Sequence, residues 1–306
     1  MKILVTGGAG FIGSHIVDLL IQNNHDVIVV DSLLTGKDSN INPESKFYNA
    51  DIRNKLDLDK IFIKENPEIV FHAAAQVDVQ KATKDPYFDA QVNILGSLNV
   101  LELSKKYNVR KIIYSNSGGA GSGEPQYLPI DENHPIKPMS HYGASKHTVE
   151  HYLDIYRELY GLKYTSLRYA NIYGPRQDPY GEGGVVAIFS NKLLHNEQPK
   201  IFGDGNQTRD FMYVEDVAEA NLLCIDKADN NILNVGTGKE TTINELFLKI
   251  KEITNSILEP IYTDRRLGDI YRSVFNIEKL KKELDYEPKT SLEEGLRKTI
   301  EYFKKF

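Results

Sequence analysis

The first half of the chain alternates short apolar runs with longer amphipathic segments. Continuous apolar runs are typical of strands buried on both faces, and here they are KILVT, VIVVD, EIVFHAA and RKIIYS. Between them, apolar residues recur three and four positions apart, which predicts helices at SHIVDLLIQN, NKLDLDKIFIKE and QVNILGSLNVLELSKKY. This alternation predicts an α/β fold with a doubly wound parallel sheet and helices on both of its faces.

After residue 170 the pattern changes to loops rich in Gly, Pro and Asp. Residues 214–237 combine a helical pattern with a strand-like run, which we interpret as a return to the first sheet. Two helical segments, TTINELFLKIKEI and SLEEGLRKTIEYFKK, come later. We therefore expect a dominant domain at 1–170 with 214–237, a smaller mixed α/β lobe at 171–213 and 238–306, and a cleft between them.

Two predicted helices carry wide apolar surfaces. The segment 92–103 is apolar almost all the way round, and such a helix needs cover on two sides. The helix that follows Tyr142 has a stripe of its own at Val149, Tyr152, Leu153, Tyr156 and Tyr160. Burial within one subunit is one explanation. We favour a homodimer whose interface is formed by the helices near 86–107 and 141–160.

Composition narrows the class of protein. The 306 residues are 41% hydrophobic and 26% charged, which suits one large or two modest cores. A net charge of −6 argues against a nucleic-acid surface, and no apolar run approaches the ~18 residues that a membrane span needs. Cys224 is the one cysteine, so no intrachain disulfide forms. We expect a cytoplasmic protein with no nucleic-acid or membrane partner.

The loop GGAGFIG, between the first strand and the first helix, is the first candidate binding element. Gly7, Gly10 and Gly13 allow a tight turn and a close approach of backbone to a diphosphate at the helix N-terminus. This pattern predicts a Rossmann dinucleotide-binding domain, although a glycine turn without a ligand is the simpler alternative. Asp31 ends the next strand, where a carboxylate binds ribose hydroxyls and selects NAD over NADP. Asp51 lies by the adenine ring or is a turn residue.

Tyr142 and Lys146 lie four residues apart on a helix that we predict to begin with Ser140, so they share one face. Tyrosine has a pKa near 10, and proton transfer at neutral pH needs a positive neighbour that stabilises the phenolate. Lys146 and a bound nicotinamide would supply that charge. The strand RKIIYS runs into SNSGGAGSG, which places Ser117 at the carboxyl end of a parallel strand, where ligands bind in open α/β sheets. Taken singly, such a Tyr-Lys pair also occurs by chance.

Together these motifs resemble the extended short-chain dehydrogenase/reductase family and its NAD-dependent epimerase/dehydratase group, most of all the UDP-glucose 4-epimerases. The resemblance covers nearly the whole chain and is carried by TGGAGFIGSH, VVDSLLTG, DIR, HAAAQVDV, VNILGSLNVL, YGASK, LRYANIYGPR, FGDGNQTRDFMYVEDVA and RLGD. It implies an enzyme that inverts C4 of a UDP-sugar. Tyr142 would take the proton of the 4-hydroxyl while hydride leaves C4 for NAD, and hydride would return to the other face of the transient 4-keto sugar.

The resemblance also implies roles for individual residues. Lys146 would lower the pKa of Tyr142 and hold the nicotinamide ribose, and Ser117 would assist at the 4-oxygen. Tightly bound NAD would contact Gly7, Gly10, Phe11, Ile12, Gly13, Asp31, Ser32, Leu33, Thr35, Gly36, Asp51, Ile52, Ala73, Ala74, Ala75, Gln76, Asn93, Ser115, Tyr142, Lys146, Tyr169 and Ala170. The UDP-sugar would contact Ser117, Tyr142, Asn171, Val185, Val186, Phe202, Arg209, Arg266 and Asp269.

The sequence departs from the family pattern beside the predicted sugar site. Asn116 stands where the family often has a hydroxyl residue, and Gly121-Ser122-Gly123 stands where it has Val-Tyr-Gly. Some epimerases carry a bulky tyrosine at the place of Ser273. These departures leave the sugar open among glucose and galactose, the N-acetylated pair and the uronates.

Other functions remain as alternatives. A uronate could be recognised through Lys81 or Lys84, whereas Gly118 after Ser117 argues against a dehydratase. A noncatalytic NAD-sensing scaffold is a remote alternative, since it would be expected to lose Tyr142, Lys146 or Ser117. We predict no metal site, because His147 and His151 have no carboxylate context in the sequence.

Overall fold

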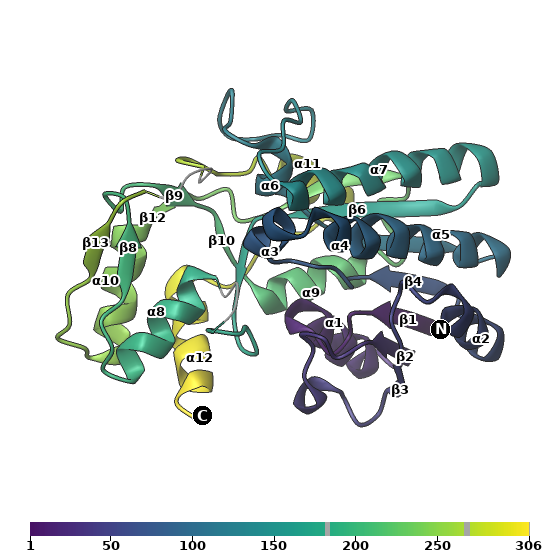
Figure 1. Ribbon diagram of the computed structural model, residues 1–306, viewed down its shortest axis with the longest axis horizontal. Coiled ribbons are helices and arrows are strands. Elements are labelled where there is room, and N and C mark those ends of the chain that lie inside the picture. The colour runs from purple at the N-terminus through teal and green to yellow at the C-terminus, as the bar shows by residue number, and fades with distance from the viewer. Residues whose placement is uncertain (181–183, 266–269, 306) are drawn as a thin grey trace.

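A seven-stranded parallel sheet forms one half of the molecule, as shown by a computed structural model that describes residues 1–180, 184–265 and 270–305 (Figure 1). Its order is β11-β6-β5-β4-β1-β2-β3. The predicted doubly wound α/β fold is confirmed. The strands are β1 (Lys2–Thr6), β2 (Asp26–Asp31), β3 (Lys46–Asn49), β4 (Ile69–His72), β5 (Lys111–Ser117), β6 (Lys163–Tyr169) and β11 (Asn231–Val235).

Helices cover both faces because successive strand residues point to opposite sides. Ile3 and Val5 belong to one core, which also includes side chains of α1 (Phe11–Gln22), α9 (Val214–Leu223) and α11 (Glu278–Leu284). Leu4 lies between them in sequence but belongs to the other core. That core includes side chains of α2 (Lys55–Glu65), α5 (Ser97–Lys106) and α7 (His141–Tyr160).

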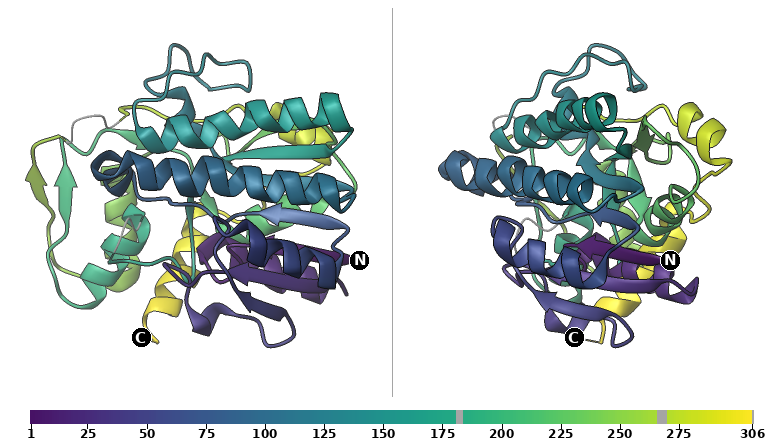
Figure 2. Two further views of the ribbon diagram at one scale, coloured as in Figure 1. Left: turned by 45° about the vertical axis from the view of Figure 1, so that its right-hand side comes forward. Right: turned by 90° about the vertical axis from the view of Figure 1, so that its right-hand side faces the viewer.

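Helix α7 begins where the sequence predicts, and its ends have clear chemical causes. The Ser140 side chain accepts a hydrogen bond from the Gly143 N–H, and Gly161 ends the helix at φ +70°. Helix α5 lies beside α7 on the same face of the sheet (Figure 2). The chain enters α5 through α3 (Val79–Lys84), α4 (Pro86–Ala90) and a π-helical segment, η2 (Gln91–Gly96).

The other half of the molecule is built around a third core, to which α8 (Val185–Leu194), α10 (Ile243–Thr254) and α12 (Leu292–Phe303) contribute (Figure 1). The C-terminal residues do not all join it, since Leu280 and Leu284 of α11 pack in the core beside the sheet. The remaining elements are η1 (Asp38–Asn40), α6 (Gly118–Ser122), β7 (Asn171–Tyr173), α8 (Val185–Leu194), β8 (Lys200–Phe202), β9 (Thr208–Arg209), β10 (Phe211–Tyr213), β12 (Thr241–Thr242), α10 (Ile243–Thr254), β13 (Ile261–Thr263) and α12 (Leu292–Phe303).

Two further properties of the chain concern its cysteine and its helices. Cys224 is a free, buried thiol. Within the three described ranges, no helix combines the length and the apolar character that crossing a membrane requires.

Candidate active site

The glycine loop connects β1 to α1 with little room for side chains. Gly7 has φ +73°, and a Cβ built there would lie 2.6 Å from the backbone nitrogen of Ala74. A Cβ on Gly13 would overlap the carbonyl oxygen of Gly7. Helix α1 has Gly10 as its N-cap, with no side-chain cap and no acidic residue in its first turn. Its first amides and its dipole therefore fit a diphosphate.

Asp31 closes the loop from the end of β2. Its carboxylate is buried and accepts hydrogen bonds from the N–H groups of Ala9, at 3.0 Å, and Leu33, at 2.9 Å. Gly36 passes so close that a Cβ there would lie 2.8 Å from the Asp31 Oδ1. Each carboxylate oxygen keeps a second lone pair, so Asp31 can still accept a ribose hydroxyl. Ser32 and Thr35 lie exposed in the same loop.

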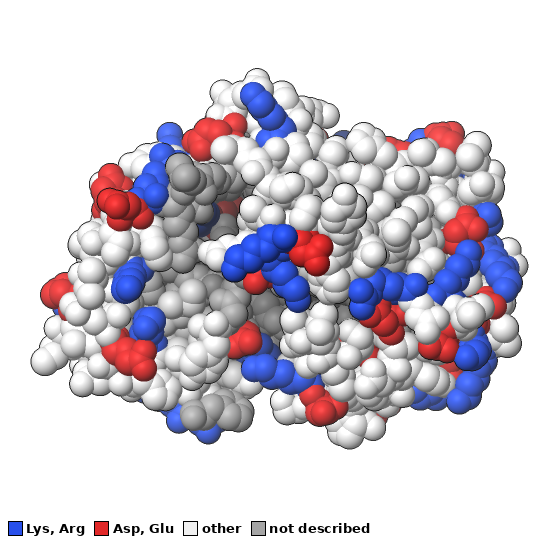
Figure 3. Space-filling view, viewed as in Figure 1, with Lys and Arg blue, Asp and Glu red and all other residues white. Residues whose placement is uncertain are grey.

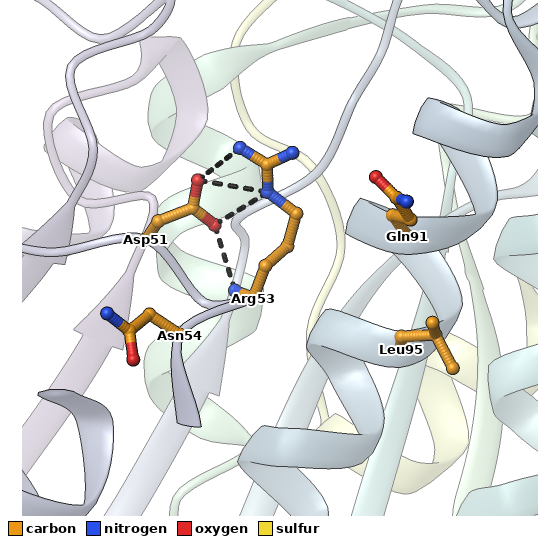
Figure 4. Close-up of a pocket in the computed structure, with 5 residues that line it drawn as sticks. All are labelled: Asp51, Arg53, Asn54, Gln91 and Leu95. Atoms are coloured by element: carbon orange, nitrogen blue, oxygen red, sulfur yellow. Dashed lines mark hydrogen bonds and ion pairs between the residues drawn. The ribbon is translucent and has the colours of Figure 1, made fainter. Parts of the chain in front are cut away.

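A pocket of about 450 Å³ is lined by Asp51, Arg53, Asn54, Gln91 and Leu95 (Figure 4). Ala50, the residue before Asp51, donates its N–H to the Asp31 carbonyl. The guanidinium of Arg53 donates through Nε and Nη2 to both oxygens of Asp51 and lowers the pKa of that carboxyl. This pair forms one wall of the pocket. Its volume is large enough for a heteroaromatic ring.

The segment after β4 continues the same edge of the sheet. The Ala73 N–H donates to the Thr6 carbonyl, so Ala73, Ala74 and Ala75 run beside the glycine loop. Gln76 and Asn93 exchange two hydrogen bonds, from the Gln76 N–H to the Asn93 Oδ1 at 2.9 Å and from the Asn93 Nδ2 to the Gln76 carbonyl at 3.0 Å. The Asn93 amide also donates to the buried carboxylate of Asp89. Ile52 is buried behind the pocket.

Lys146 is 3% exposed in α7, and its Nζ lies 4.2 Å from the centre of the Tyr114 ring. Burial lowers the pKa of Lys146 to about 7, although Asp89 and Glu150 act in the opposite direction. The Tyr114 hydroxyl donates to the Lys146 carbonyl at 3.2 Å. Tyr142, one turn earlier, is half-buried on the same helical face. A buried ammonium is therefore placed one helical turn from a phenol.

Ser117 is brought to this helix by a close backbone approach. It is the last residue of β5 and is followed by the short helix α6, which contacts α7. A Cβ on Gly143 would overlap the carbonyl oxygen of Ala120, so the residue after Tyr142 has no room for a side chain. The Ser117 N–H donates to the Asn116 Oδ1 at 2.8 Å. Ser117 and Tyr142 thus belong to two segments in direct contact.

Ser115, Tyr169 and Ala170 lie at the same ends of β5 and β6. The hydroxyls of Ser115 and Tyr169 are 3.1 Å apart, and Tyr169 also exchanges hydrogen bonds with Asn221. Ala170 donates its N–H to the Val235 carbonyl. These contacts join the carboxyl ends of β5, β6 and β11 into one surface.

The predicted nucleotide-sugar residues come from the other half of the molecule. Phe202 lines a second pocket of about 230 Å³, together with Gly203, Asp204, Gln207, Arg265, Ile270 and Tyr271. Asn171 is exposed at the start of β7, and Arg209 ends β9. Val185 and Val186 begin α8, but the Val186 side chain is buried in the third core and leaves its backbone for any ligand contact. Arg266 and Asp269 lie outside the described residues.

The surface is hollowed between the two halves (Figure 3). Most residues predicted for the cofactor lie in the half of the molecule built on the sheet, together with Ser117 and Tyr142. The other described residues predicted for the UDP-sugar, Asn171, Val185, Val186, Phe202 and Arg209, lie in β7, α8, β8 and β9. Sequence reasoning missed Arg53, Asp89, Glu150, Arg265 and Tyr271. Glu150 had a signal, because it continues the four-residue spacing of Tyr142 and Lys146, whereas Asp89 is distant in sequence and had none.

Histidines at this site do not assemble a metal centre. In the described part of the chain, no three His, Cys, Asp or Glu side chains are grouped so that they could hold a metal ion. His147 and His151 stack edge to face, 4.8 Å apart, on α7. His72 is buried between Thr6 and Ser97, and burial lowers its pKa to about 3, so it is a neutral packing residue.

Residues 3–236 match the model of the NAD dependent epimerase/dehydratase family. The chain belongs to this family. A putative UDP-glucose 4-epimerase of Methanocaldococcus jannaschii is 52% identical over 302 residues, 99% of this chain and 98% of that epimerase. The family assignment and the NAD dependence predicted from the sequence are confirmed.

Solved structures of this epimerase/dehydratase family are similar over their full lengths. A UDP-glucose 4-epimerase from Thermotoga maritima, with UDP-glucose, has a TM-score of 0.98, 52% identity and coverage of 100% of this chain and 99% of its own. A Thermus thermophilus UDP-glucose 4-epimerase in complex with NAD has a TM-score of 0.94, 42% identity and coverage of 99% of both chains. A UDP-N-acetylglucosamine 4-epimerase from Methanobrevibacter ruminantium, with UDP-N-acetylmuramic acid, has a TM-score of 0.95, 39% identity and coverage of 99% of this chain and 98% of its own.

Proposed function

We propose that this protein interconverts UDP-glucose and UDP-galactose, with NAD held tightly through the reaction. The observation that carries the proposal is the arrangement of Tyr142 and Lys146 on α7, in contact with the segment that follows Ser117, at the carboxyl ends of the sheet strands. Membership of the epimerase/dehydratase family supports it.

The three residues have different roles in the proposed reaction. Tyr142 accepts the proton of the sugar 4-hydroxyl as C4 becomes a ketone, and later returns it. The Lys146 ammonium stabilises the phenolate of Tyr142 and binds the nicotinamide ribose. Ser117 donates a hydrogen bond to the 4-oxygen. NAD, held by the predicted cofactor residues, would supply reversible hydride transfer at C4 of the sugar.

The described residues fit NAD. The glycine loop leaves backbone amides for a diphosphate, the Asp31 carboxylate keeps lone pairs that could accept a ribose hydroxyl, and the pocket beside Asp51 and Arg53 is large enough for a base. We propose that the first domain, 1–170 with 214–237, binds NAD through the cofactor residues predicted from the sequence. The second lobe, 171–213 and 238–306, would bind UDP through Asn171, Val185, Val186, Phe202, Arg209, Arg266 and Asp269.

The segment that follows Ser117, at the proposed sugar site, supports a wider substrate range. A Cβ on Gly119 would lie 3.7 Å from the Ser273 hydroxyl, and a Cβ on Gly121 would have nothing within 4 Å. Gly119 and Gly121 therefore have space beside them, whereas Gly118 packs against the Phe275 ring. We propose that the N-acetylated UDP-sugars also react, and a rate on UDP-GlcNAc below about a thousandth of that on UDP-glucose would reject this extension.

A uronate has less support as the substrate. The Lys81 Nζ lies 4.7 Å from the centre of the Phe88 ring, so this lysine already has an aromatic partner. Glycine at position 118 leaves the position after Ser117 without an acid for dehydration.

Helices η2, α5 and α7 present the surface that we propose as a homodimer interface. Leu95 is 55%, Ile155 45%, Leu159 67% and Tyr160 51% exposed, although all four are apolar or aromatic. A second copy would bury this surface. The buried thiol of Cys224, without a disulfide, supports a cytoplasmic location.

The first experiment is to incubate the purified protein with UDP-galactose and no added NAD, and to follow UDP-glucose by NMR. The expected result is conversion by the wild type and none by Tyr142→Phe, because phenylalanine cannot accept the proton. Wild-type protein that stays inactive with added NAD on UDP-galactose, UDP-GlcNAc and UDP-glucuronate would overturn the proposal.

A further inference from the structure

A buried carboxylate lies directly behind the proposed catalytic residues. Glu150 follows Lys146 by one turn of α7 and is 3% exposed. Its Oε1 accepts hydrogen bonds from the Asn116 Nδ2 at 2.8 Å and from the Arg168 Nε at 3.1 Å, and its Oε2 accepts from the Arg168 Nη2 at 2.7 Å. Asn116 and Arg168 are buried as well. The cluster therefore joins α7 to β5 and β6.

Glu150 is ionised in this environment. Burial alone raises the pKa of its carboxyl, but hydrogen bonds from His147 and Arg168 outweigh burial and bring the pKa to about 2. The charge is balanced by Arg168, 2.7 Å away. An ionised carboxylate can only accept hydrogen bonds. Any group that contacts Glu150 Oε1 must therefore donate.

This requirement orients the Asn116 amide. Its Nδ2 must face Glu150, and so its Oδ1 must face the other way. There the Oδ1 accepts the Ser117 N–H at 2.8 Å. A chain of two hydrogen bonds thus runs from the Glu150 carboxylate through Asn116 to the backbone of Ser117.

We propose that Glu150 and Asn116 are positioning residues that hold Ser117 at a fixed place relative to Tyr142. The inference rests on the proposed epimerase function. Ser117 is the last residue of β5, and the ladder with β6 ends at its pair with Tyr169. Glu150 and Tyr142 share helix α7. The relay, which is the pair of hydrogen bonds from Glu150 through Asn116 to Ser117, therefore fixes the position of Ser117 relative to the helix that carries Tyr142. An orienting role predicts a loss of kcat with little change in KM.

The first test is Asn116→Ala, which removes the relay but keeps the Glu150–Arg168 ion pair. We expect kcat on UDP-galactose to fall about 10- to 100-fold, with KM and the amount of bound NAD near their wild-type values. Tyr164→Phe is the matched control. It removes a 2.7 Å hydrogen bond from β6 to Asp154 of α7, and neither group is hydrogen-bonded to Asn116 or Ser117 among the described contacts. We expect kcat of the control to change less than about twofold.

The second test is Asn116→Asp, which places a carboxyl against Glu150, with His147 and Lys146 of α7 and Arg168 of β6 around it. Repulsion by Glu150 raises the pKa of the new carboxyl, and only its protonated form can donate as the amide does. The kcat of this variant, divided by that of the wild type, should therefore rise as pH falls from about 8 to about 6. A ratio that does not change with pH would contradict the relay.

Hydrogen exchange of the Ser117 amide tests the same contact without turnover. We expect faster exchange in Asn116→Ala and unchanged exchange in Tyr164→Phe. Unchanged exchange in Asn116→Ala, or wild-type kcat with only a lower melting temperature, would overturn the inference and leave the cluster a packing element. A wild-type protein inactive on every UDP-sugar, yet showing the expected exchange, would refute the proposed function and leave the relay in place.

Discussion

The glycine loop after β1 and the centre around Lys146 are built in opposite ways. At the loop, backbone lies against backbone, and a Cβ on Gly7 would come within 2.6 Å of the Ala74 nitrogen. At Lys146, side chains from several elements surround one buried charge. Burial lowers the pKa of Lys146, and the carboxylates of Asp89 and Glu150 raise it. The conformation of the loop requires positions without side chains, whereas the charge state of Lys146 depends on its buried charged neighbours.

This difference predicts two kinds of sensitivity. Steric overlap with backbone cannot be relieved by a rotamer change, so the loop should respond to a single methyl group with a near-complete loss of cofactor. Buried charges share their stabilisation among several partners, so substitutions at the centre should give graded effects that depend on pH. The predictions below test this contrast.

The largest effect is expected for Gly13→Ala. Its methyl group would overlap the Gly7 carbonyl oxygen and push the loop away from the diphosphate site. We expect purified Gly13→Ala to contain almost no NAD, measured by release and chromatography. Gly161→Ala is the control, since Gly161 has φ +70° but nothing within 4 Å of a Cβ. It should cost about 1 kcal/mol of stability and keep its NAD.

Lys146→Met should reduce kcat by about 10²- to 10³-fold, because it removes the charge that stabilises the Tyr142 phenolate. The substitution should also change how the free energy of unfolding depends on pH. Burial lowers the pKa of Lys146 to about 7, below the ~10.4 of lysine in an unfolded chain. Between these values the unfolded chain binds more protons, so stability due to Lys146 rises with pH.

The free energy of unfolding of the wild type minus that of Lys146→Met should therefore increase by about 1 kcal/mol per pH unit from about pH 7 to pH 9. Urea denaturation of both proteins at several pH values measures it. A difference that stays constant over this range would show that the buried lysine is not neutral there.

Asp31→Asn tests the carboxylate that accepts hydrogen bonds from the loop. The asparagine Oδ1 can accept one of the two backbone hydrogen bonds of Asp31, but the NH₂ group cannot accept the other. We expect about a tenfold weaker affinity for NAD and a smaller preference for NAD over NADP, measured by titration of NAD-free protein. An unchanged affinity would show that backbone alone builds this end of the site.

The smallest effect on kcat is expected for Leu159→Asp, at the exposed end of α7, away from both regions. A charge there should disfavour burial against a second copy and shift the protein to monomers in size-exclusion chromatography. We expect kcat to change less than about twofold. Ile257→Asp, at a 90% exposed position elsewhere, should leave the oligomeric state unchanged.

The sequence alone was sufficient to predict the elements whose patterns are local. β1, β2, β4 and β5 are continuous apolar runs, and Ser140 marks the start of α7 through a capping bond to the next turn. β6 was not predicted, because its run, KYTSLRY, mixes polar and apolar residues. It is buried all the same, since Thr165, Ser166 and Arg168 find hydrogen-bond partners inside the fold.

Local spacing also determined the candidate chemistry: the glycines, the Tyr142–Lys146 pair and Ser117 all follow from short-range patterns. Tertiary structure alone decided what surrounds them. Asp89 lies in α4, Asn116 in β5 and Arg168 in β6, and no sequence spacing relates these residues to Lys146 or to Glu150. They meet because the parallel sheet brings its strand ends to one edge beneath α7, where low dielectric makes each buried charge depend on the partners that the fold supplies.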